Sequence, residues 1–330
     1  MNLPDFDDVS EAAERIRGEA VRTPLVYARA ASEALGRPVY VKPECLQRTG
    51  AFKFRGAYNR ISQISPGEAP GGVVAVSSGN HAQGVAAAAA IMGLSAKIVM
   101  PADAPAAKIE GTLALGAEIA WFDRDKDNRE AMAADIARKE NRIFISPFDD
   151  VDVIAGQWTV GLEITEDADA AGLDVAAVLA PVGGGGLIAG VGLAVGARLP
   201  GAKIYGVEPE GFDDTRRSLA AGERVTNNRQ TGSICDSLLT PLPGELTFAL
   251  NRKQLAGVLT VSDDEAGQAV AHCYHNLKLV VEPGGAAAMA AVLQGRVPAG
   301  DGAIIAVLSG GNVDAGMFAE LINAKSSVAD

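Results

Sequence analysis

The chain has 330 residues, of which 29 are Lys or Arg and 41 are Asp or Glu, so its formal charge is −12 at pH 7. This acidic balance, without a basic block, argues against nucleic acid or an anionic membrane as a partner. Because 48% of the residues are apolar, the chain can bury a core, which excludes a disordered protein. Glycine is abundant, with 38 residues, and indicates backbone packed closely against other backbone or against a ligand.

The three cysteines, Cys45, Cys235 and Cys273, are scattered and form no CxxC pair, which is typical of reduced thiols in a cytoplasmic protein. The acidic N-terminus lacks the apolar core of a secretory signal. Residues 175–197 carry no charge and are long enough to cross a bilayer. They include Pro181 and four consecutive glycines, which are costly in a lipid-exposed helix. We therefore interpret them as a buried strand, a glycine turn and a small-residue helix.

Short apolar runs alternate with longer helical patterns, which predicts an α/β fold of mostly parallel sheets covered by helices. In chain order we expect a strand at 39–42, a helix at 54–64, a strand at 73–76, a helix at 81–92, a strand at 96–100, a helix at 106–115, a strand at 118–122, a helix at 128–140 capped by Asp127, a helix at 153–166, a strand at 177–180, a helix at 187–198, a strand at 203–207, helices at 263–276 and 282–294, and a strand at 303–308. The pattern favours two domains: a large one of residues 1–70 and 148–330, and a smaller one inserted at 71–147.

A run of four glycines, Gly183 to Gly186, follows one predicted strand and opens a helix. Bare N–H groups at a helix N-terminus suit an anion, and the helix dipole favours phosphate there. The residues leave three interpretations open. The spacing of the glycines, with Glu208 further along the chain, fits a dinucleotide site; a lone phosphate group also fits; and close helix–strand packing needs no ligand.

Lys53 lies between Phe52 and Phe54 at the start of a predicted helix. Apolar neighbours and the positive end of the helix dipole both favour the neutral amine, which is the form that attacks a carbonyl carbon. The alternative is a lysine that keeps its ammonium group in water on an amphipathic helix.

Two more loops follow predicted strands, at the positions where open α/β sheets bind their ligands. The segment Ser77-Ser78-Gly79-Asn80-His81 offers hydroxyl and N–H groups that could hold a carboxylate, or could only cap the next helix. The segment Ser309-Gly310-Gly311-Asn312 is either a ligand loop or a simple turn.

The chain contains, in this order, the motif Phe52-Lys53-x-Arg55-Gly56-Ala57 and the segments 77–81, 183–186 and 309–312. This series of motifs resembles the pattern of the threonine/serine dehydratases and serine racemases. Those proteins are pyridoxal-phosphate enzymes of the tryptophan-synthase-β type, also called fold type II, with two open and mostly parallel α/β domains. The resemblance covers nearly the whole chain, from about Thr23 to the last strand, and it displaces the dinucleotide interpretation.

The resemblance implies a role for each matching residue. Lys53 would form the Schiff base with pyridoxal 5'-phosphate, and Phe52 would lie against its ring. Asn80 would hold the ring hydroxyl, and Ser309 would face the pyridine nitrogen. A serine there, in place of an aspartate, favours β-elimination over transamination. The cofactor phosphate would be held by the N–H groups of Gly183, Gly184, Gly185, Gly186 and Leu187.

The resemblance also implies how a substrate is held. Its α-carboxylate would lie among Ser77, Ser78, Asn80 and His81. Lys53 would remove the α-proton as a catalytic base. Ser78 matches the residue that serine racemases place on the opposite face, so it would be the second catalytic residue, and racemisation stays open.

A divalent-cation site is implied by the stretch Glu208-Pro209-Glu210-Gly211-Phe212-Asp213-Asp214, which resembles the metal loop of serine racemases. The ligands would be Glu208, Asp214 and the carbonyl oxygen of Phe212. Carboxylate and carbonyl oxygens suit Mg²⁺, Ca²⁺ or Mn²⁺. An acidic surface loop without a metal is the alternative.

The expected activity is an ammonia-lyase reaction that removes water from a hydroxy amino acid of the threonine or serine type, giving a 2-oxo acid and ammonia. Arg129 matches an arginine that serine racemases turn toward a dicarboxylate, which makes 3-hydroxyaspartate an alternative substrate; a solvent-facing arginine is the other interpretation. Dehydratases of this family commonly have Asp-Gly where this chain has Asp236-Ser237, so contacts near the β-substituent stay open.

Three other functions are alternatives to the dehydratase: serine racemase, a catalytically silent amino-acid sensor, and an NAD-dependent oxidoreductase. The retention of both Lys53 and Ser78 argues against the sensor. No additional carboxyl-terminal regulatory domain is expected, and the family leads us to expect a homodimer that binds a small amino acid.

Overall fold

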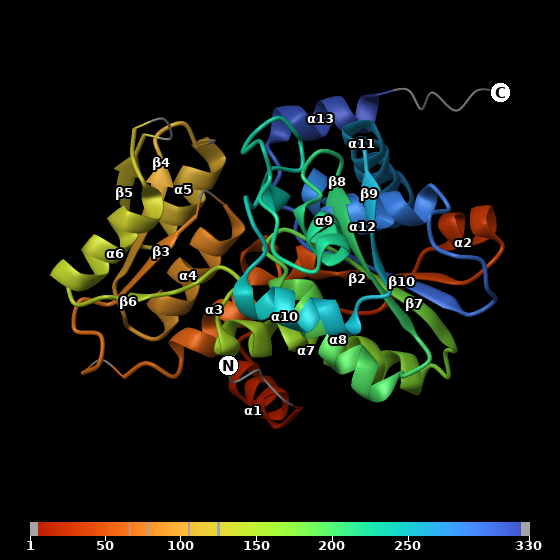
Figure 1. Ribbon diagram of the computed structural model, residues 1–330, viewed down its shortest axis with the longest axis horizontal. Helices are drawn as coiled ribbons and strands as arrows, with labels where there is room; N and C mark the ends of the chain where they lie inside the picture. The colour runs from red at the N-terminus through yellow and green to blue at the C-terminus, as the bar shows by residue number, and fades with distance from the viewer. Residues whose placement is uncertain (1–5, 66, 78, 105, 124–125, 325–330) are drawn as a thin grey trace.

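The structure, a computed structural model, describes residues 6–65, 67–77, 79–104, 106–123 and 126–324. Its strands form two separate sheets (Figure 1), one of six strands in the order β1-β2-β10-β7-β8-β9 and one of four strands in the order β5-β4-β3-β6. Neighbouring strands are parallel in both sheets, apart from β1, which pairs antiparallel with β2. Two open, mostly parallel sheets confirm the predicted α/β fold.

The larger sheet is built from both ends of the chain. Its strands are β1 (Val26–Tyr27), β2 (Val39–Pro43), β7 (Val175–Pro181), β8 (Lys203–Pro209), β9 (Gly257–Val261) and β10 (Ala303–Leu308). The helices in this part of the chain are α1 (Phe6–Ile16), α2 (Arg29–Leu35), α3 (Lys53–Ile61), α7 (Val151–Ala170), α8 (Gly186–Arg198), α9 (Asp214–Ala221), α10 (Glu245–Gln254), α11 (Asp263–His272), α12 (Pro283–Leu293) and α13 (Ala315–Asn323).

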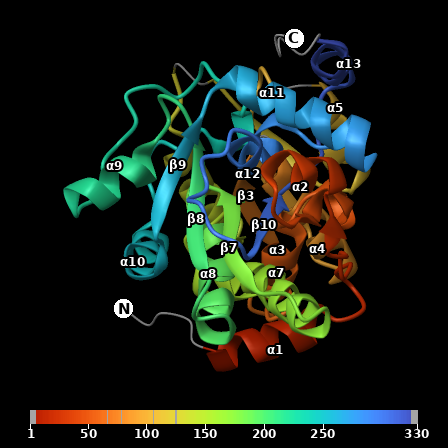
Figure 2. The ribbon, with the colours of Figure 1, turned by 90° about the vertical axis from the view of Figure 1, so that its right-hand side faces the viewer.

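The central strand β10 shows how the larger sheet is buried on both faces. Because successive side chains of a strand point to opposite faces, Ile304 and Ala306 pack in the cluster that contains α12. Ile305 and Val307 pack instead in the cluster that contains α7 and α8. Figure 2 shows α7 and α8 on one side of the sheet and α11 and α12 on the other. Burial on both faces explains why this strand is an unbroken apolar run.

The smaller sheet is formed by β3 (Val73–Val76), β4 (Ala96–Pro101), β5 (Glu118–Phe122) and β6 (Ile143–Phe144). It carries the helices α4 (Asn80–Ile91), α5 (Ala106–Ala114) and α6 (Arg129–Lys139). Residues of α4 share one core cluster with β3, β4 and α3, so α3 lies at the junction of the two sheets (Figure 1). All four strands fall inside residues 71–147, the range predicted for the smaller domain, whose limits stay a prediction.

Every strand predicted from the sequence is present, and the last one matches to the residue. The uncharged stretch 175–197 forms β7, a glycine turn and most of α8, as predicted. Among the described residues, no helix is both long and apolar enough to span a bilayer.

Two predictions of detail were wrong, and several elements were not predicted. Asn128, not Asp127, caps α6, because its side chain accepts a hydrogen bond from the Ala131 N–H. The helix expected at 263–276 is α-helical only to His272 and continues as a π-helical turn, Cys273–Leu277. The helix α10 and the strand β9 were not predicted at all.

Candidate active site

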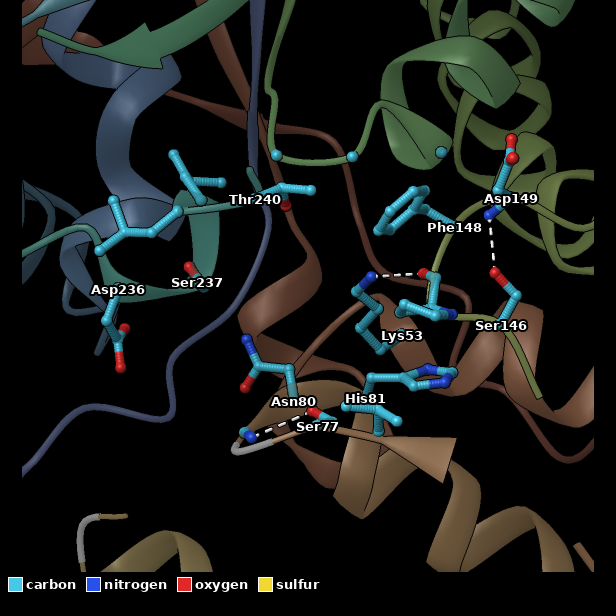
Figure 3. A pocket seen from close by; sticks show the side chains of 18 of the residues that line it. Lys53, Ser77, Asn80, His81, Ser146, Phe148, Asp149, Asp236, Ser237 and Thr240 are labelled. Atoms are coloured by element: carbon cyan, nitrogen blue, oxygen red, sulfur yellow. Dashed lines mark hydrogen bonds between the residues drawn. The ribbon is translucent and has the colours of Figure 1, made fainter. Parts of the chain in front are cut away.

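A pocket of about 400 Å³ lies where the carboxyl ends of strands from both sheets meet. It brings together most of the residues predicted to bind cofactor and substrate, which are Phe52, Lys53, Ser77, Asn80, His81, Arg129, Gly183, Gly184, Gly185, Gly186, Leu187 and Ser309. Ser78 lies outside the described residues. Segments far apart in sequence therefore converge on one cavity (Figure 3).

Lys53 is the first residue of α3, and its amine faces this cavity (Figure 3). Its Nζ donates a hydrogen bond of 2.6 Å to the carbonyl oxygen of Pro147 and lies 5.2 Å from the centre of the Phe52 ring. Burial penalises the charged form and lowers the pKa of Lys53 to about 8. At pH 7 about a tenth of the amine is therefore unprotonated, and this fraction can act as a nucleophile or a base.

The start of α3 is held in place by close backbone contacts. A Cβ on Gly156 of α7 would lie 2.6 Å from the Cα of Gly56, so these two helices cross without room for a side chain. On another side, a Cβ on Gly84 of α4 would lie 3.2 Å from the carbonyl carbon of Lys53. Some of the abundant glycines thus allow α4 and α7 to pack closely against α3, the helix that carries the Lys53 amine.

The glycine run forms the turn between β7 and α8, with Gly185 as the N-cap of the helix. Gly185 has φ = +91°, a left-handed conformation that favours glycine. A Cβ on Gly184 would lie 2.2 Å from the Phe148 ring, so any larger residue would clash. A bare turn at the N-terminus of a helix has the donors and the dipole to hold a phosphate group, and it lies in the same pocket as the amine of Lys53. These residues fit pyridoxal phosphate.

The loop after β3 leads into α4, which begins at Asn80 and has Gly79 as its N-cap. The first N–H groups of a helix have no partner inside the helix, so this end can receive a carboxylate. The Ser77 hydroxyl accepts a hydrogen bond from the Gly79 N–H at 3.1 Å. The Ser77 side chain therefore stabilises the conformation of the loop and also lines the pocket.

His81 is buried and is held as the neutral imidazole. Burial and the nearby Lys53 charge lower its pKa to about 3. Its Nε2 donates to the carbonyl oxygen of Ile145 at 3.0 Å, which leaves Nδ1 unprotonated and, in this structure, without a partner. The side chain can accept a hydrogen bond but cannot donate to a carboxylate, so its backbone N–H is the better candidate for that contact.

Ser309 directly follows β10 and is buried at the pocket wall. Its carbonyl oxygen accepts a hydrogen bond from the Phe52 N–H at 3.1 Å, which ties the strand end to the segment before Lys53. Asn80, opposite, donates through Nδ2 to Glu282 and accepts from the Asn312 amide at 2.8 Å. The side chain of Asn80 is therefore fixed before any ligand arrives.

Arg129, the first residue of α6, reaches the pocket from the smaller sheet. Its Nε donates to Glu130 at 2.8 Å, and the side chain is about one-third exposed. This placement leaves the guanidinium group at the rim of the pocket, where it could meet a charged group on a substrate.

The predicted metal ligands lie outside this pocket, at the end of β8 and in the segment that follows it. Glu208 is fully buried, and its carboxylate accepts hydrogen bonds from the N–H groups of Thr215 and Arg216 at 2.8 and 3.0 Å. Asp214 accepts from Asn227 at 2.6 Å, but its Oδ2 is buried without a partner. Burial and the neighbouring Asp214 raise the pKa of Glu208 to about 8, and burial raises the pKa of Asp214 to about 7. Two buried carboxylates with one orphaned oxygen fit a divalent cation.

The described residues contain no group of three or more His, Cys, Asp or Glu side chains placed so that together they could hold a metal ion. A cation here would therefore need backbone carbonyl or water ligands in addition to Glu208 and Asp214. Phe212 is buried in the turn between β8 and α9, where its N–H donates to the Pro209 carbonyl at 3.0 Å.

Several pocket residues were not identified from the sequence. Phe148 packs under the glycine turn, Thr240 lies beside Gly183, and Lys108 of α5 forms an ion pair with Asp236 across the pocket. Phe148 comes shortly after a short strand, and this position is the sequence feature that could have identified it as a pocket residue. The other contacts join residues far apart in sequence, and no local pattern marks them.

Comparison with known proteins identifies the family. Residues 16–310 match the family described as pyridoxal-phosphate dependent enzyme. The L-threonine ammonia-lyase of Thermotoga maritima is 41% identical over 320 residues, which cover 96% of this chain and 78% of that protein. The L-threo-3-hydroxyaspartate ammonia-lyase of Saccharomyces cerevisiae is 39% identical over 325 residues, which cover 98% of both chains. The structure of maize serine racemase superposes with a TM-score of 0.91 at 36% identity, covering 97% of both chains.

The predicted family and the predicted fold type are confirmed by these similarities together with the two parallel sheets. The dinucleotide interpretation of the glycine turn is set aside. The chain belongs to the family of pyridoxal-phosphate-dependent enzymes.

Proposed function

We propose that this enzyme is an ammonia-lyase that removes water from a small hydroxy amino acid and yields a 2-oxo acid and ammonia. The observation that carries the proposal is the position of the Lys53 amine, in one pocket with the glycine turn and the N-terminus of α4. This arrangement supports the proposal that a base, an anion-binding turn and a carboxylate-binding helix end act around one reacting centre.

Each part of the pocket has a task that follows from its chemistry. The N–H groups of residues 183–187 hold the cofactor phosphate, and Asn80 and Ser309 contact the ring. When bound, pyridoxal phosphate supplies an electron sink for negative charge at the substrate α-carbon. The N–H groups at the start of α4 hold the substrate carboxylate. Lys53, with its lowered pKa, takes up the α-proton at Nζ. The β-hydroxyl leaves with a proton as water, and water then hydrolyses the released enamine to the 2-oxo acid and ammonia.

Replacement of Lys53 tests this assignment most directly. In Lys53→Ala we expect both turnover and the visible absorption of the lysine-bound cofactor to be lost, because the other lysine that lines the pocket, Lys108, is held in an ion pair with Asp236. Lys203→Ala, at an exposed position on β8, should keep both properties. A Lys53→Ala enzyme with wild-type turnover would contradict the proposal.

The substrate is proposed to be threonine or serine, with 3-hydroxyaspartate as the second candidate. Arg129 supports the second candidate, because a guanidinium at the pocket rim can form a two-point contact with a second carboxylate. Turnover of threonine, serine and the diastereomers of 3-hydroxyaspartate should be compared. Arg129→Ala is expected to lower kcat/KM about tenfold or more for 3-hydroxyaspartate alone, since a charge-assisted contact contributes about 1.5–3 kcal/mol.

The matched control is Arg138→Ala, an exposed residue of the same helix that pairs with Asp135. It should leave all substrates unaffected. Equal losses for threonine and 3-hydroxyaspartate in Arg129→Ala would show that Arg129 acts on the fold and does not contact a second carboxylate. Measurement of serine enantiomer exchange in the same panel decides between lyase and racemase.

We also propose that Glu208, Asp214 and the Phe212 carbonyl bind a divalent cation such as Mg²⁺, Ca²⁺ or Mn²⁺. The orphaned Asp214 oxygen supports this assignment. Asn227 joins this loop to the pocket, because its Nδ2 contacts both Asp214 and the carbonyl oxygen of Thr240. A bound cation would therefore stabilise the segment that lies beside Gly183.

The remaining parts of the proposal concern the protein in its cell. We propose a cytoplasmic homodimer. The three cysteines are free thiols in the structure, and two of them are buried, which suits a reducing compartment. Sedimentation of the purified protein tests the dimer.

A further inference from the structure

The helix α10 lies beside the glycine turn and contacts its backbone. The Thr247 hydroxyl donates a hydrogen bond of 2.6 Å to the carbonyl oxygen of Gly184, and the Gly244 N–H reaches the same oxygen at 3.3 Å. One helical turn later, the Asn251 amide donates to the carbonyl oxygen of Gly185 at 3.4 Å. Thr247 and Asn251 are both buried, so these donors are available only to the glycine turn.

These contacts determine which way the glycine N–H groups point. In a planar trans peptide, the carbonyl oxygen and the N–H of the next residue point in opposite directions. Because α10 holds the Gly184 carbonyl oxygen on its own side, the N–H group of Gly185 is directed away from α10. The Gly185 carbonyl oxygen accepts the Ala189 N–H of α8 at 2.9 Å as well as the longer bond from Asn251. The pocket lies on the side away from α10, since its lining includes all four glycines but no residue of that helix.

The helix α10 is itself anchored. The Asp149 carboxylate accepts hydrogen bonds from the N–H groups of Glu245, Leu246 and Thr247 at 2.9, 2.8 and 3.3 Å. At its other end, the Gln254 amide donates to the carbonyl oxygen of Ala189 in α8 at 3.0 Å. Phe148, next to Asp149 in sequence, packs against the opposite side of the turn. The glycine turn is therefore clamped between Phe148 and α10.

We propose that Thr247, supported by Asn251, is a positioning residue that keeps the glycine-turn N–H groups aimed at the cofactor phosphate. The proposal rests on the assignment of this turn to the phosphate. Thr247 does not touch the cofactor; it acts through the Gly184 carbonyl oxygen. Without the Thr247 hydroxyl, the Gly184 carbonyl oxygen keeps the longer bond of 3.3 Å from the Gly244 N–H. The peptide between Gly184 and Gly185 then rotates more easily, because glycine offers little resistance.

The test is retention of the cofactor by the purified holoenzyme. Thr247→Val keeps the shape of the side chain but removes the donor. We expect cofactor release after dilution, followed by the visible absorption band, to be about tenfold faster, as loss of one buried hydrogen bond predicts. The ³¹P resonance of the bound cofactor should shift, because fewer N–H groups face the phosphate. Thr247→Ser retains the hydroxyl and should restore both readouts to within about twofold of wild type.

The control is Thr165→Val, which removes an equally buried threonine hydroxyl that bonds within α7. It should lower stability without a change in release rate or ³¹P resonance. The proposal is overturned if Thr247→Val holds the cofactor as wild type does, if Thr165→Val releases it equally fast, or if Thr247→Ser behaves like Thr247→Val. A wild-type protein that binds no pyridoxal phosphate would refute the proposed function instead.

Discussion

Lys53 and Arg55 lie two residues apart at the start of α3, and the protein surrounds these two cations in opposite ways. Arg55 is fully buried, and its guanidinium donates to Glu44 and Glu163 at 2.7 Å each. Burial alone would lower its pKa, but the two carboxylates raise it overall. Lys53 donates to the neutral carbonyl oxygen of Pro147, and burial lowers its pKa to about 8.

The difference in their surroundings distinguishes Arg55, whose charge stabilises the fold, from Lys53, whose amine is proposed to react. Around Arg55, Lys42 also bonds to Glu163, so two cations and two carboxylates neutralise each other inside the protein. This network joins β2 to α3 and α7, directly behind the pocket. Within the part of the chain that the structure describes, Lys53 has no comparable counterion, so burial favours loss of its proton. A third region contains the buried carboxylates of Glu208 and Asp214. Among the described residues no buried cation contacts them, and we propose that a metal ion binds there.

Removing the buried cation is expected to have the largest effect. Arg55→Met leaves Glu44 buried with only the Thr23 hydroxyl as a direct side-chain donor, while Glu163 keeps Lys42. Loss of one partner from such a network costs about 3–5 kcal/mol, to be measured by urea unfolding. Arg60→Met, on the same helix with weaker contacts of 3.5 and 3.7 Å to Asp150 and Asp152, should cost less than about 1 kcal/mol. Equal losses in the two variants would contradict the structural role of the network.

Removing the proposed cation should have the next largest effect. A chelator is expected to lower the free energy of unfolding by about 2.7 kcal/mol relative to protein with the free cation at a hundred times its Kd. Glu208→Gln combined with Asp214→Asn abolishes the charge and should make the stability insensitive to the chelator. A chelator effect that persists in the double variant would place the ion elsewhere.

The smallest of the three effects tests whether the pocket keeps His81 neutral. The unfolded chain takes up a proton on this histidine below pH ~6.5, whereas the folded protein does so only near its pKa of about 3. Stability is therefore lost as the pH falls from ~6.5 toward 3. Between pH 7.5 and 5.5 the wild type should lose about 1.4 kcal/mol more than His81→Gln. Parallel curves for wild type and His81→Gln would refute the prediction.

Much of the site could be predicted because its motifs are local. The amine of Lys53, the glycine turn and the Ser309 loop each follow a strand or open a helix, and such positions are recognisable from neighbouring residues alone. Neighbouring residues that could each serve as the same helix cap were harder to distinguish. Asp127 and Asn128 are both good N-caps, and only the observed hydrogen bond to Ala131 decides between them.

The helix α10 could not be predicted in the same way. Its sequence, Glu-Leu-Thr-Phe-Ala-Leu-Asn-Arg-Lys-Gln, follows a proline- and glycine-containing segment. Its contacts with the glycine turn join residues more than 60 positions apart. Thr247 and Asn251 carry no local mark of their function, because their partners are backbone carbonyl oxygens in a distant segment.

The amino-acid sequence was sufficient for the alternation of strands and helices, the buried runs such as β10, and the family motifs that place a lysine and a glycine turn. These features depend on residues close together in the chain. Tertiary structure decided which buried cation received counterions, which histidine nitrogen stayed unpaired, and which helix supports the glycine turn. Those outcomes depend on desolvation and on donors meeting acceptors across the fold, which exist only once distant segments have packed.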